Sequence, residues 1–144
     1  MENAGRILVP LDGSACSENV IPKIEELVIE RKEGICLLRV VSAHTFPGVD
    51  KTEAEVKVVR EAEEYLESLK ERFKAKGFDA DTHVRYGNDV EEILNHAAGK
   101  DIDMIAMSTH GYRGVKRLLF GSVAGKVLQH TSKPVFLIRC TGSA

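Results

Sequence analysis

Residues Asp101–Arg139 read DIDMIAMSTHGYRGVKRLLFGSVAGKVLQHTSKPVFLIR. This stretch opens with a short apolar run, Ile102–Met107, and continues through a loop that contains glycines and basic residues. A segment with helical spacing follows at Ser122–His130, and Pro134 then precedes a second apolar run, Val135–Arg139. Apolar runs with little strict alternation are typical of strands that are covered on both faces. A strand, a helix and another strand in this order therefore predict one crossover unit of a parallel sheet.

The same alternation of strand and helix patterns extends back to the beginning of the chain. Three further β-type runs precede the quoted stretch: Arg6–Pro10, Ile35–Val41 and Thr82–Tyr86. A segment with helical spacing follows each of them in turn: Ser17–Val28, Thr52–Lys76 and Val90–Ala98. Pro22 is expected to disturb the first turns of the first helix, and Gly77 to terminate the second. Asn88 and Glu91 resemble a capping box that opens the third helix.

This order of elements predicts the fold class. We expect an α/β protein with an open, doubly wound sheet of five parallel strands and helices on both faces, because right-handed crossovers favour that topology. The length of 144 residues fits one domain, residues 1–144. Ligands of such sheets bind beyond the carboxyl ends of the strands, where the strand order reverses. The residues that directly follow the strands therefore form the candidate site.

Composition and charge exclude several classes of protein. Hydrophobic residues make up 43% of the chain and charged residues 29%, which rules out a disordered chain. The 20 Lys and Arg residues nearly balance the 22 Asp and Glu residues, and the formal net charge is −2. We therefore expect neither a nucleic acid nor a membrane as a partner, although a small local basic site is compatible with this balance.

The sequence also predicts where the protein works. Its first residues, Met1–Gly5, are polar, and no window approaches about 18 apolar residues, so we expect neither a signal peptide nor a membrane span. Cys16, Cys36 and Cys140 are widely separated and form no CxxC pair. That pattern favours a reducing setting over a disulfide framework or a zinc site. We expect a soluble, cytoplasmic protein.

The first strand ends at an acidic turn. Asp12 presents a carboxylate at the edge of the predicted sheet, and Gly13 with Ser14 permits a tight turn toward the first helix. A carboxylate in this place would accept hydrogen bonds from a ribose hydroxyl or an amine. It would equally serve to cap the first helix or the turn itself. The residues of this segment leave both roles open.

The fourth strand leads into a segment with a stronger functional signal. Small residues flank basic ones in it: Ser108, Gly111, Gly114 and Gly121 surround Arg113, Lys116 and Arg117. Phosphate binding needs this combination, because backbone N–H groups must approach the oxygens without a Cβ in the way. The helix that begins at Ser122 adds a favourable dipole and a hydroxyl donor. The alternative is that the glycines only shape a loop and the basic residues form a solvated face.

Other motifs do not support a catalytic or a metal-binding role. Gly121–Val127 superficially resembles a P-loop, but its spacing is one residue short and Val127 replaces the Ser or Thr that would hold magnesium. Lys126 is therefore expected on the surface. His110 lies in the suspected site with no Ser or Cys nucleophile beside it. The other histidines show no metal-ligand spacing: His44, His83, His96 and His130. We therefore assign no catalytic residue and no metal ligand.

In these features the sequence resembles the universal stress proteins over essentially its whole length. The matching stretches are RILVPLDGS at 6–14, LLRVV at 37–41, YGNDVEEIL at 86–94 and the stretch 101–139 quoted above. The resemblance implies a Rossmann-like sheet of five parallel strands in the order 3-2-1-4-5. It also implies a homodimer that forms through the last strand, Val135–Arg139, whose apolar edge otherwise invites pairing.

One branch of this family binds ATP through the motif G-x2-G-x9-G-[S/T]. Its positions fall on Ser108, Gly111, Gly121 and Ser122, so three of the four match. The hydroxyl of Ser108 can donate to a phosphate, whereas its Cβ can obstruct a backbone contact or a required positive φ. The resemblance implies ATP with Mg²⁺ as the cofactor. It places adenine and ribose against Pro10, Asp12 and Val40, and the phosphates against 108–114 and 121–124. The full predicted set is Pro10, Asp12, Val40, Met107, Ser108, Thr109, His110, Gly111, Arg113, Gly114, Gly121, Ser122, Val123 and Ala124.

Three classes of function compete for this sequence. The leading hypothesis is a homodimeric, ATP-binding, nucleotide-dependent regulator in the stress response. The alternative, which Ser108 favours, is a stress-related protein-interaction module that does not bind nucleotide. An enzyme is the third class, but no general base or carboxylate pair for magnesium is identifiable, so we expect at most slow ATP hydrolysis. A two-component receiver is disfavoured because no phosphoacceptor Asp follows the third strand at Tyr86–Asn88.

Overall fold

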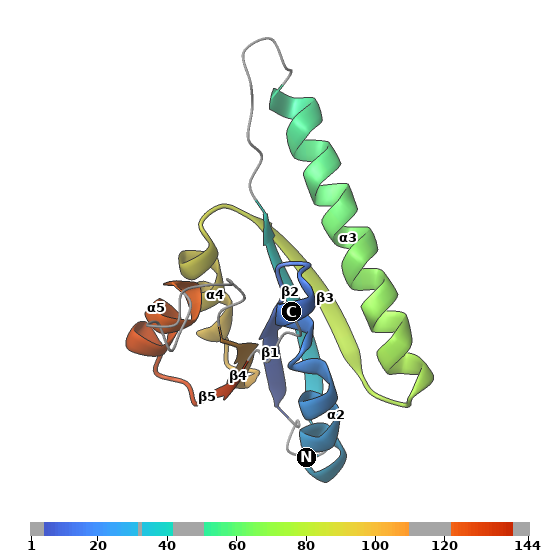
Figure 1. Ribbon diagram of the computed structural model, residues 1–144, viewed down its shortest axis with the longest axis vertical. Coiled ribbons are helices and arrows are strands. Elements are labelled where there is room, and N and C mark those ends of the chain that lie inside the picture. Colours follow the sequence, from blue (N-terminus) through green and yellow to red (C-terminus); the bar gives the residue numbers. More distant parts are fainter. Residues whose placement is uncertain (1–4, 32, 42–50, 110–121, 140–144) are drawn as a thin grey trace.

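The computed structural model describes residues 5–31, 33–41, 51–109 and 122–139. Five parallel strands form one sheet in the order β3-β2-β1-β4-β5, as Figure 1 shows. The strands are β1 (Arg6–Pro10), β2 (Gly34–Val41), β3 (Ala80–Tyr86), β4 (Ile102–Ser108) and β5 (Val135–Ile138). The predicted fold class and the strand order 3-2-1-4-5 are both confirmed.

The helices cover the two faces of the sheet separately. They are α1 (Ala15–Glu18), α2 (Ile21–Arg31), α3 (Lys51–Ala75), α4 (Asp89–Ala97) and α5 (Ser122–His130). In Figure 1, α2 and α3 lie on one side of the sheet and α4 and α5 on the other. Within the described part of the chain, no helix combines the length and the apolar character that crossing a membrane requires.

Alternate residues of the same strands pack in two apolar layers, one on each face of the sheet, because successive side chains of a strand point to opposite faces. The layer under α2 and α3 includes Ile7, Val9, Ile35, Leu37, Ile24, Val28, Leu66 and Phe73. The layer under α4 and α5 includes Leu8, Cys36, Leu38, Ile105, Met107, Ile93, Ala97, Ala124 and Val127. Burial on both faces explains why the central strands read as nearly continuous apolar runs in the sequence.

The helix predicted at Ser17–Val28 is wrong in its bounds, since the structure divides it into α1 and α2. The chain leaves the first helix at Asn19 and enters the second at Ile21. Pro22 lies in the first turn of α2, where a missing backbone N–H removes no bond within the helix. The proline therefore sets the beginning of a second helix instead of distorting a single longer one.

Two predicted helix boundaries are confirmed. Gly77 has φ +87° after α3, and the N–H of Phe78 donates to the carbonyl of Phe73 at 2.9 Å. This is a Schellman-type ending, and the rings of Phe73 and Phe78 pack edge to face at 6.1 Å to complete it. At the start of α4, the side chain of Asn88 accepts a hydrogen bond from the N–H of Glu91 at 3.0 Å.

Candidate functional site

The strand order reverses between β1 and β4. From β1 the chain moves outward to β2 and β3, and it later returns to place β4 on the other side of β1. The carboxyl ends of the strands lie along the upper edge of the sheet in Figure 1. Pro10 is the last residue of β1 and Ser108 the last residue of β4. Pro10 and Ser108, with Asp12 and Thr109 shortly after them, therefore lie at the topological switch point, where sheets of this class bind ligands.

Hydrogen bonds within the turn after β1 hold it in place. The N–H of Ser14 donates to Oδ1 of Asp12 at 2.8 Å, and the N–H of Ser17 donates to Oγ of Ser14 at 3.1 Å. Gly13 between them has φ +87°, a conformation that favours glycine. Ser14 thus caps α1, and Asp12 supports the turn that precedes it. Asp12 itself remains exposed, so the carboxylate that supports the turn is also accessible to a ligand.

The surroundings of Asp12 keep its carboxylate charged. Partial burial raises the pKa of Asp12, but hydrogen bonds from Ser14 and Ser17 and the charge of Arg39 outweigh this and hold the pKa below its ordinary value. Arg39 lies on β2, and its guanidinium group is close to the turn at Gly13. A Cβ added to Gly13 would lie 3.6 Å from the guanidinium carbon. The sequence analysis did not identify Arg39 as a site residue. Its position directly before Val40 was the available signal.

Residues of α1 lie against the end of β4. Sγ of Cys16 is 3.3 Å from the carbonyl oxygen of Thr109 and 4.0 Å from Oγ of Ser108. The fold thereby brings α1, the helix that follows the acidic turn after β1, against Ser108 and Thr109, which lie more than ninety positions further along the chain. Cys16 is disulfide-bonded, which corrects the expectation that this chain carries no disulfide.

Ser108 has an ordinary strand conformation. It pairs with Ile138 of β5, and the N–H of the next residue, Thr109, donates to the carbonyl of Ile138 at 2.7 Å. An extended backbone is open to any residue, so a positive φ does not argue against serine at this motif position. The Cβ and the hydroxyl of Ser108 remain as the two differences from glycine.

Four other predicted residues belong to the apolar layer under α4 and α5. Met107 and Ala124 are 6% and 4% exposed, so their side chains are part of the core. Val40 and Val123 are half-buried and pack against the same layer. Pro10 is half-buried at the end of β1. Met107 and Ala124 would therefore approach a ligand through their backbone atoms.

The remaining predicted residues are not placed by the structure. His110, Gly111, Arg113, Gly114 and Gly121 lie outside the described residues. Ser122 begins α5, but its side chain is not described. Lys126 of the rejected P-loop motif is exposed on α5, as expected. The assignment of residues around the phosphates therefore stays a prediction.

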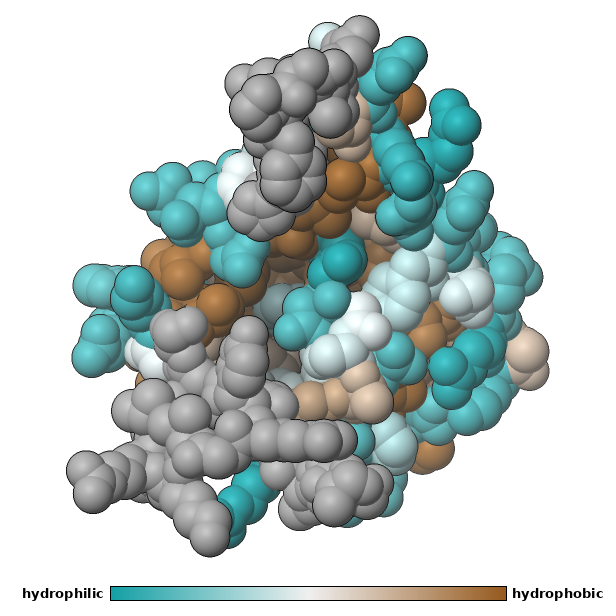
Figure 2. All heavy atoms as spheres, turned by 45° about the horizontal axis from the view of Figure 1, so that its top comes forward, coloured by the Kyte–Doolittle hydropathy of each residue, from teal (hydrophilic) through white to brown (hydrophobic). Residues whose placement is uncertain are grey.

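The carboxyl edge of the sheet faces the viewer in Figure 2. Apolar side chains reach the surface there among exposed polar ones. A separate hollow runs along the first half of α3, between Thr52 and Glu64, and its lining includes none of the predicted ligand residues. The described part of the predicted site is therefore an open edge, formed by a charged turn and a strand end.

The structure also brings together three residues that the sequence analysis missed as a group. Cys36 of β2, His83 of β3 and His96 of α4 each offer a metal-ligating atom, and these atoms lie within 4.8 Å of one another. The sequence did not predict this group because the three residues are far apart along the chain, whereas metal-site motifs are recognised from the spacing of residues close in sequence.

Comparison with known proteins gives consistent matches across the chain. The model of the family described as the universal stress protein family matches residues 3–139. Universal stress protein YxiE of Bacillus subtilis is 31% identical over 147 residues, which cover 93% of this chain and 98% of the relative.

Solved structures give the same result. The structure of hypothetical protein MJ0577 superimposes with a TM-score of 0.84 at 27% identity, and the match covers 99% of this chain and all of the other. The universal stress protein from Archaeoglobus fulgidus in complex with dAMP has a TM-score of 0.70 at 21% identity, covering 95% and 99% of the two chains. At that identity the second likeness shows the shared fold.

Proposed function

The chain belongs to the universal stress protein family, and from this membership we infer that it binds an adenine nucleotide, ATP with Mg²⁺, and acts as a nucleotide-dependent regulator in the stress response. One observation carries the proposal. At the switch point of the sheet, Cys16 of α1, the helix that directly follows the turn around Asp12, lies against the strand end at Ser108 and Thr109. A nucleotide bound at this edge would span both segments.

The described residues fit the nucleoside half of such a ligand. Pro10 and Val40 offer half-buried apolar surface for a base, and Asp12 offers a charged, exposed acceptor for ribose hydroxyls. Ser108 occupies the first position of the glycine motif, and its hydroxyl would donate a hydrogen bond to a phosphate. When bound, the triphosphate with its Mg²⁺ would supply a charged group whose presence the protein could report to a partner. The dAMP complex of the Archaeoglobus fulgidus protein supports an adenine ligand for this fold.

Calorimetric titration with magnesium ATP tests the proposal. We expect saturable binding to the full chain, and at least about tenfold weaker binding after Asp12→Asn, because a hydrogen bond from a ribose hydroxyl to a charged acceptor contributes about 1.5 kcal/mol or more. Asp103→Asn is the matched control, since Asp103 is an exposed carboxylate near the opposite end of the sheet. Absence of heat at millimolar nucleotide would contradict the proposal.

A second variant tests the phosphate half. Gly121→Val adds a branched side chain at the third motif position, where the backbone must approach a phosphate. We expect it to weaken ATP more than adenosine, because adenosine carries no phosphate. Unchanged affinity for ATP would mean that the phosphates bind elsewhere.

The second candidate is a stress-related interaction module that does not use nucleotide, and Ser108 in place of the first motif glycine favours it. Mass spectrometry of the supernatant released by heating the purified protein separates the two functions. Copurified adenine nucleotide supports the first, and its absence together with silent calorimetry supports the second. For the nucleotide-binding function we propose at most slow hydrolysis, since the sequence offers no identifiable general base or carboxylate pair for magnesium.

We also propose a cytoplasmic homodimer whose subunits meet at β5, with no nucleic acid and no membrane as partner. β5 is an edge strand of the sheet, and all four of its residues, Val135–Ile138, are half-buried in the single chain. An apolar edge strand of this kind is a template for pairing with a second copy.

A further inference from the structure

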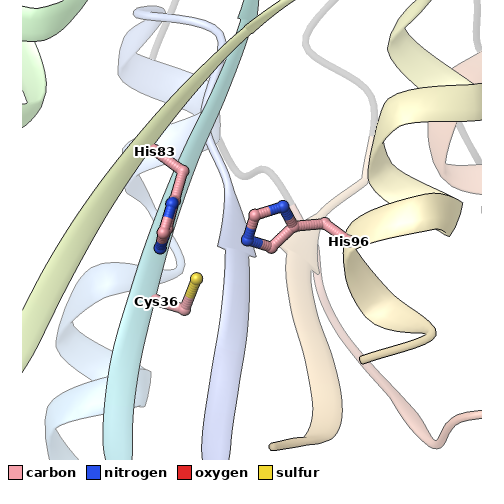
Figure 3. Close-up of side chains that lie close together, drawn as sticks. All are labelled: Cys36, His83 and His96. Carbon is pink, nitrogen blue, oxygen red and sulfur yellow. The ribbon is translucent and has the colours of Figure 1, made fainter. Parts of the chain in front are cut away.

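Three potential metal ligands converge beneath α4, away from the nucleotide edge. Figure 3 shows Cys36, His83 and His96 pointing toward one another from β2, β3 and α4. Their ligand atoms all lie within 4.8 Å of one another, and the two imidazole rings are 4.6 Å apart between centroids. Cys36 is 2% exposed, and both histidines are half-buried.

The register of the sheet explains this convergence. Cys36 pairs with Asp81, and Leu38 pairs with His83, so Cys36 and His83 point to the same face of two adjacent strands. This is the face that α4 covers, and His96 lies in the last turn of that helix beside buried Ala97. Parallel strand pairing and helix packing therefore place a thiol and two imidazoles around one point.

A carboxylate holds one of the imidazoles in position. Oδ2 of Asp81 lies 3.2 Å from Nε2 of His83, and its Oδ1 lies 3.5 Å from the guanidinium of Arg6. Metal-binding histidines commonly donate their second ring N–H to a carboxylate, which fixes the tautomer and raises the basicity of the ligating nitrogen. In the tautomer with the proton on Nε2, the hydrogen bond to Asp81 leaves Nδ1 of His83 free to bind a metal.

The protonation states have opposite effects on metal binding. Burial, together with His83 and Arg85, lowers the pKa of His96, which favours the neutral imidazole that a metal requires. Burial and the nearby charge of Asp81 raise the pKa of the Cys36 thiol to about 12, so a metal would have to displace its proton. Metal ions deprotonate coordinating thiols outright, and binding would release one proton per site.

We propose that Cys36, His83 and His96 bind a zinc ion. Zinc accepts thiolate and imidazole ligands at about 2.3 Å and 2.0 Å, which places neighbouring ligand atoms about 3.5 Å apart. The three side chains would therefore close by about 1 Å around the ion, within the reach of their rotamers. The fourth position would be taken by water, as in zinc sites with three protein ligands.

This site is independent of the nucleotide proposal. Cys36 and Val40 are four positions apart on β2, which corresponds to about 13 Å along the strand. The ion would connect the edge strand β3 to the central β2 and to α4. Zinc that binds only the folded state stabilises it by mass action.

Zinc titration of the full chain, stripped of metal with a chelator and free of nucleotide, tests the proposal by calorimetry. We expect one ion per chain for the wild type. Asp81→Asn should weaken binding about 10-fold to 100-fold, because it removes the carboxylate that orients His83. His83→Gln and His96→Gln should weaken it further, whereas His130→Gln, which removes an exposed histidine of α5, should not change the affinity. Equal affinities for all these proteins, or no binding to the wild type, would overturn the proposal.

The absorption spectrum of bound cobalt tests the ligands directly, because it does not depend on folding alone. Co²⁺ in the site should give the charge-transfer absorption of a thiolate ligand and the visible bands of a tetrahedral ion. Cys36→Ala should abolish the charge-transfer band, and His130→Gln should retain it. Circular dichroism of each metal-free variant establishes that it is folded. If Cys36→Ala keeps the band, the thiolate comes from another cysteine and the assignment is wrong.

Discussion

At the scale of single residues, Asp12 supports its turn and keeps its side chain exposed for the binding role that we propose. Its Oδ1 accepts the N–H of Ser14 and so supports the turn before α1, while the side chain stays exposed at the switch point. Because the turn holds the carboxylate in place, a ligand would meet a charged acceptor whose position is already set. A supporting role and a binding role are therefore compatible in this residue.

The lowered pKa of Asp12 predicts a pH dependence of stability. A depressed carboxyl pKa contributes stability above the ordinary value of 3.8, and this contribution is lost as the pH falls through the lowered value in the folded state. We expect Asp12→Asn to destabilise the protein by about 0.5 kcal/mol at neutral pH, a small effect because the side chain is exposed. Urea unfolding should show this difference at about pH 7 and lose most of it at about pH 3.

Ser108 permits a second test at this scale, because Ala and Gly separate the effect of its hydroxyl from that of its Cβ. If the hydroxyl donates to a phosphate, Ser108→Ala and Ser108→Gly should both weaken ATP binding about tenfold. If the Cβ is the obstacle instead, Ser108→Gly alone should bind ATP more tightly than the wild type. Parallel calorimetry of the two variants decides between these outcomes.

At the scale of elements, local sequence signals predicted where helices begin and end better than whether one helical segment is a single helix or two. Asn88 and Gly77 mark the beginning of α4 and the end of α3 as predicted, because a cap needs only its own residue and a few neighbours. The division between α1 and α2 was not predicted. It depends on Ser14 capping one short helix and Pro22 opening the next, two signals that compete within a few residues.

The ending of α3 gives a prediction about stability. A Cβ added at Gly77 meets nothing within 4 Å, so substitution there would affect only the backbone conformation at φ +87°. We expect Gly77→Ala to lower the free energy of unfolding by about 1 kcal/mol, and Gly77→Asn by less, because Asn tolerates the left-handed region. Urea denaturation of the three proteins measures the series. Equal losses for Ala and Asn would point to a packing effect instead.

At the scale of the whole molecule, the two apolar layers bury the central strands and leave β5 as an edge. The half-buried residues of β5 predict that Leu137→Lys shifts the proposed dimer toward monomer, because a charge on an edge strand opposes pairing. Leu128→Lys on α5 is the matched control, since Leu128 is 41% exposed and lies outside the strand. Sedimentation equilibrium should show the dimer for the wild type and the control. A monomeric wild type would contradict the interface.

The sequence by itself determined the element order, the parallel sheet and the residues at the strand ends. These are properties of local pattern, since the alternation of buried strands and amphipathic helices permits few topologies. Only the tertiary structure decided that Cys16 lies against Ser108, that Met107 and Ala124 are buried, and that Cys36 meets His83 and His96. The physical reason is that such contacts depend on strand register and helix placement, which bring together residues tens of positions apart.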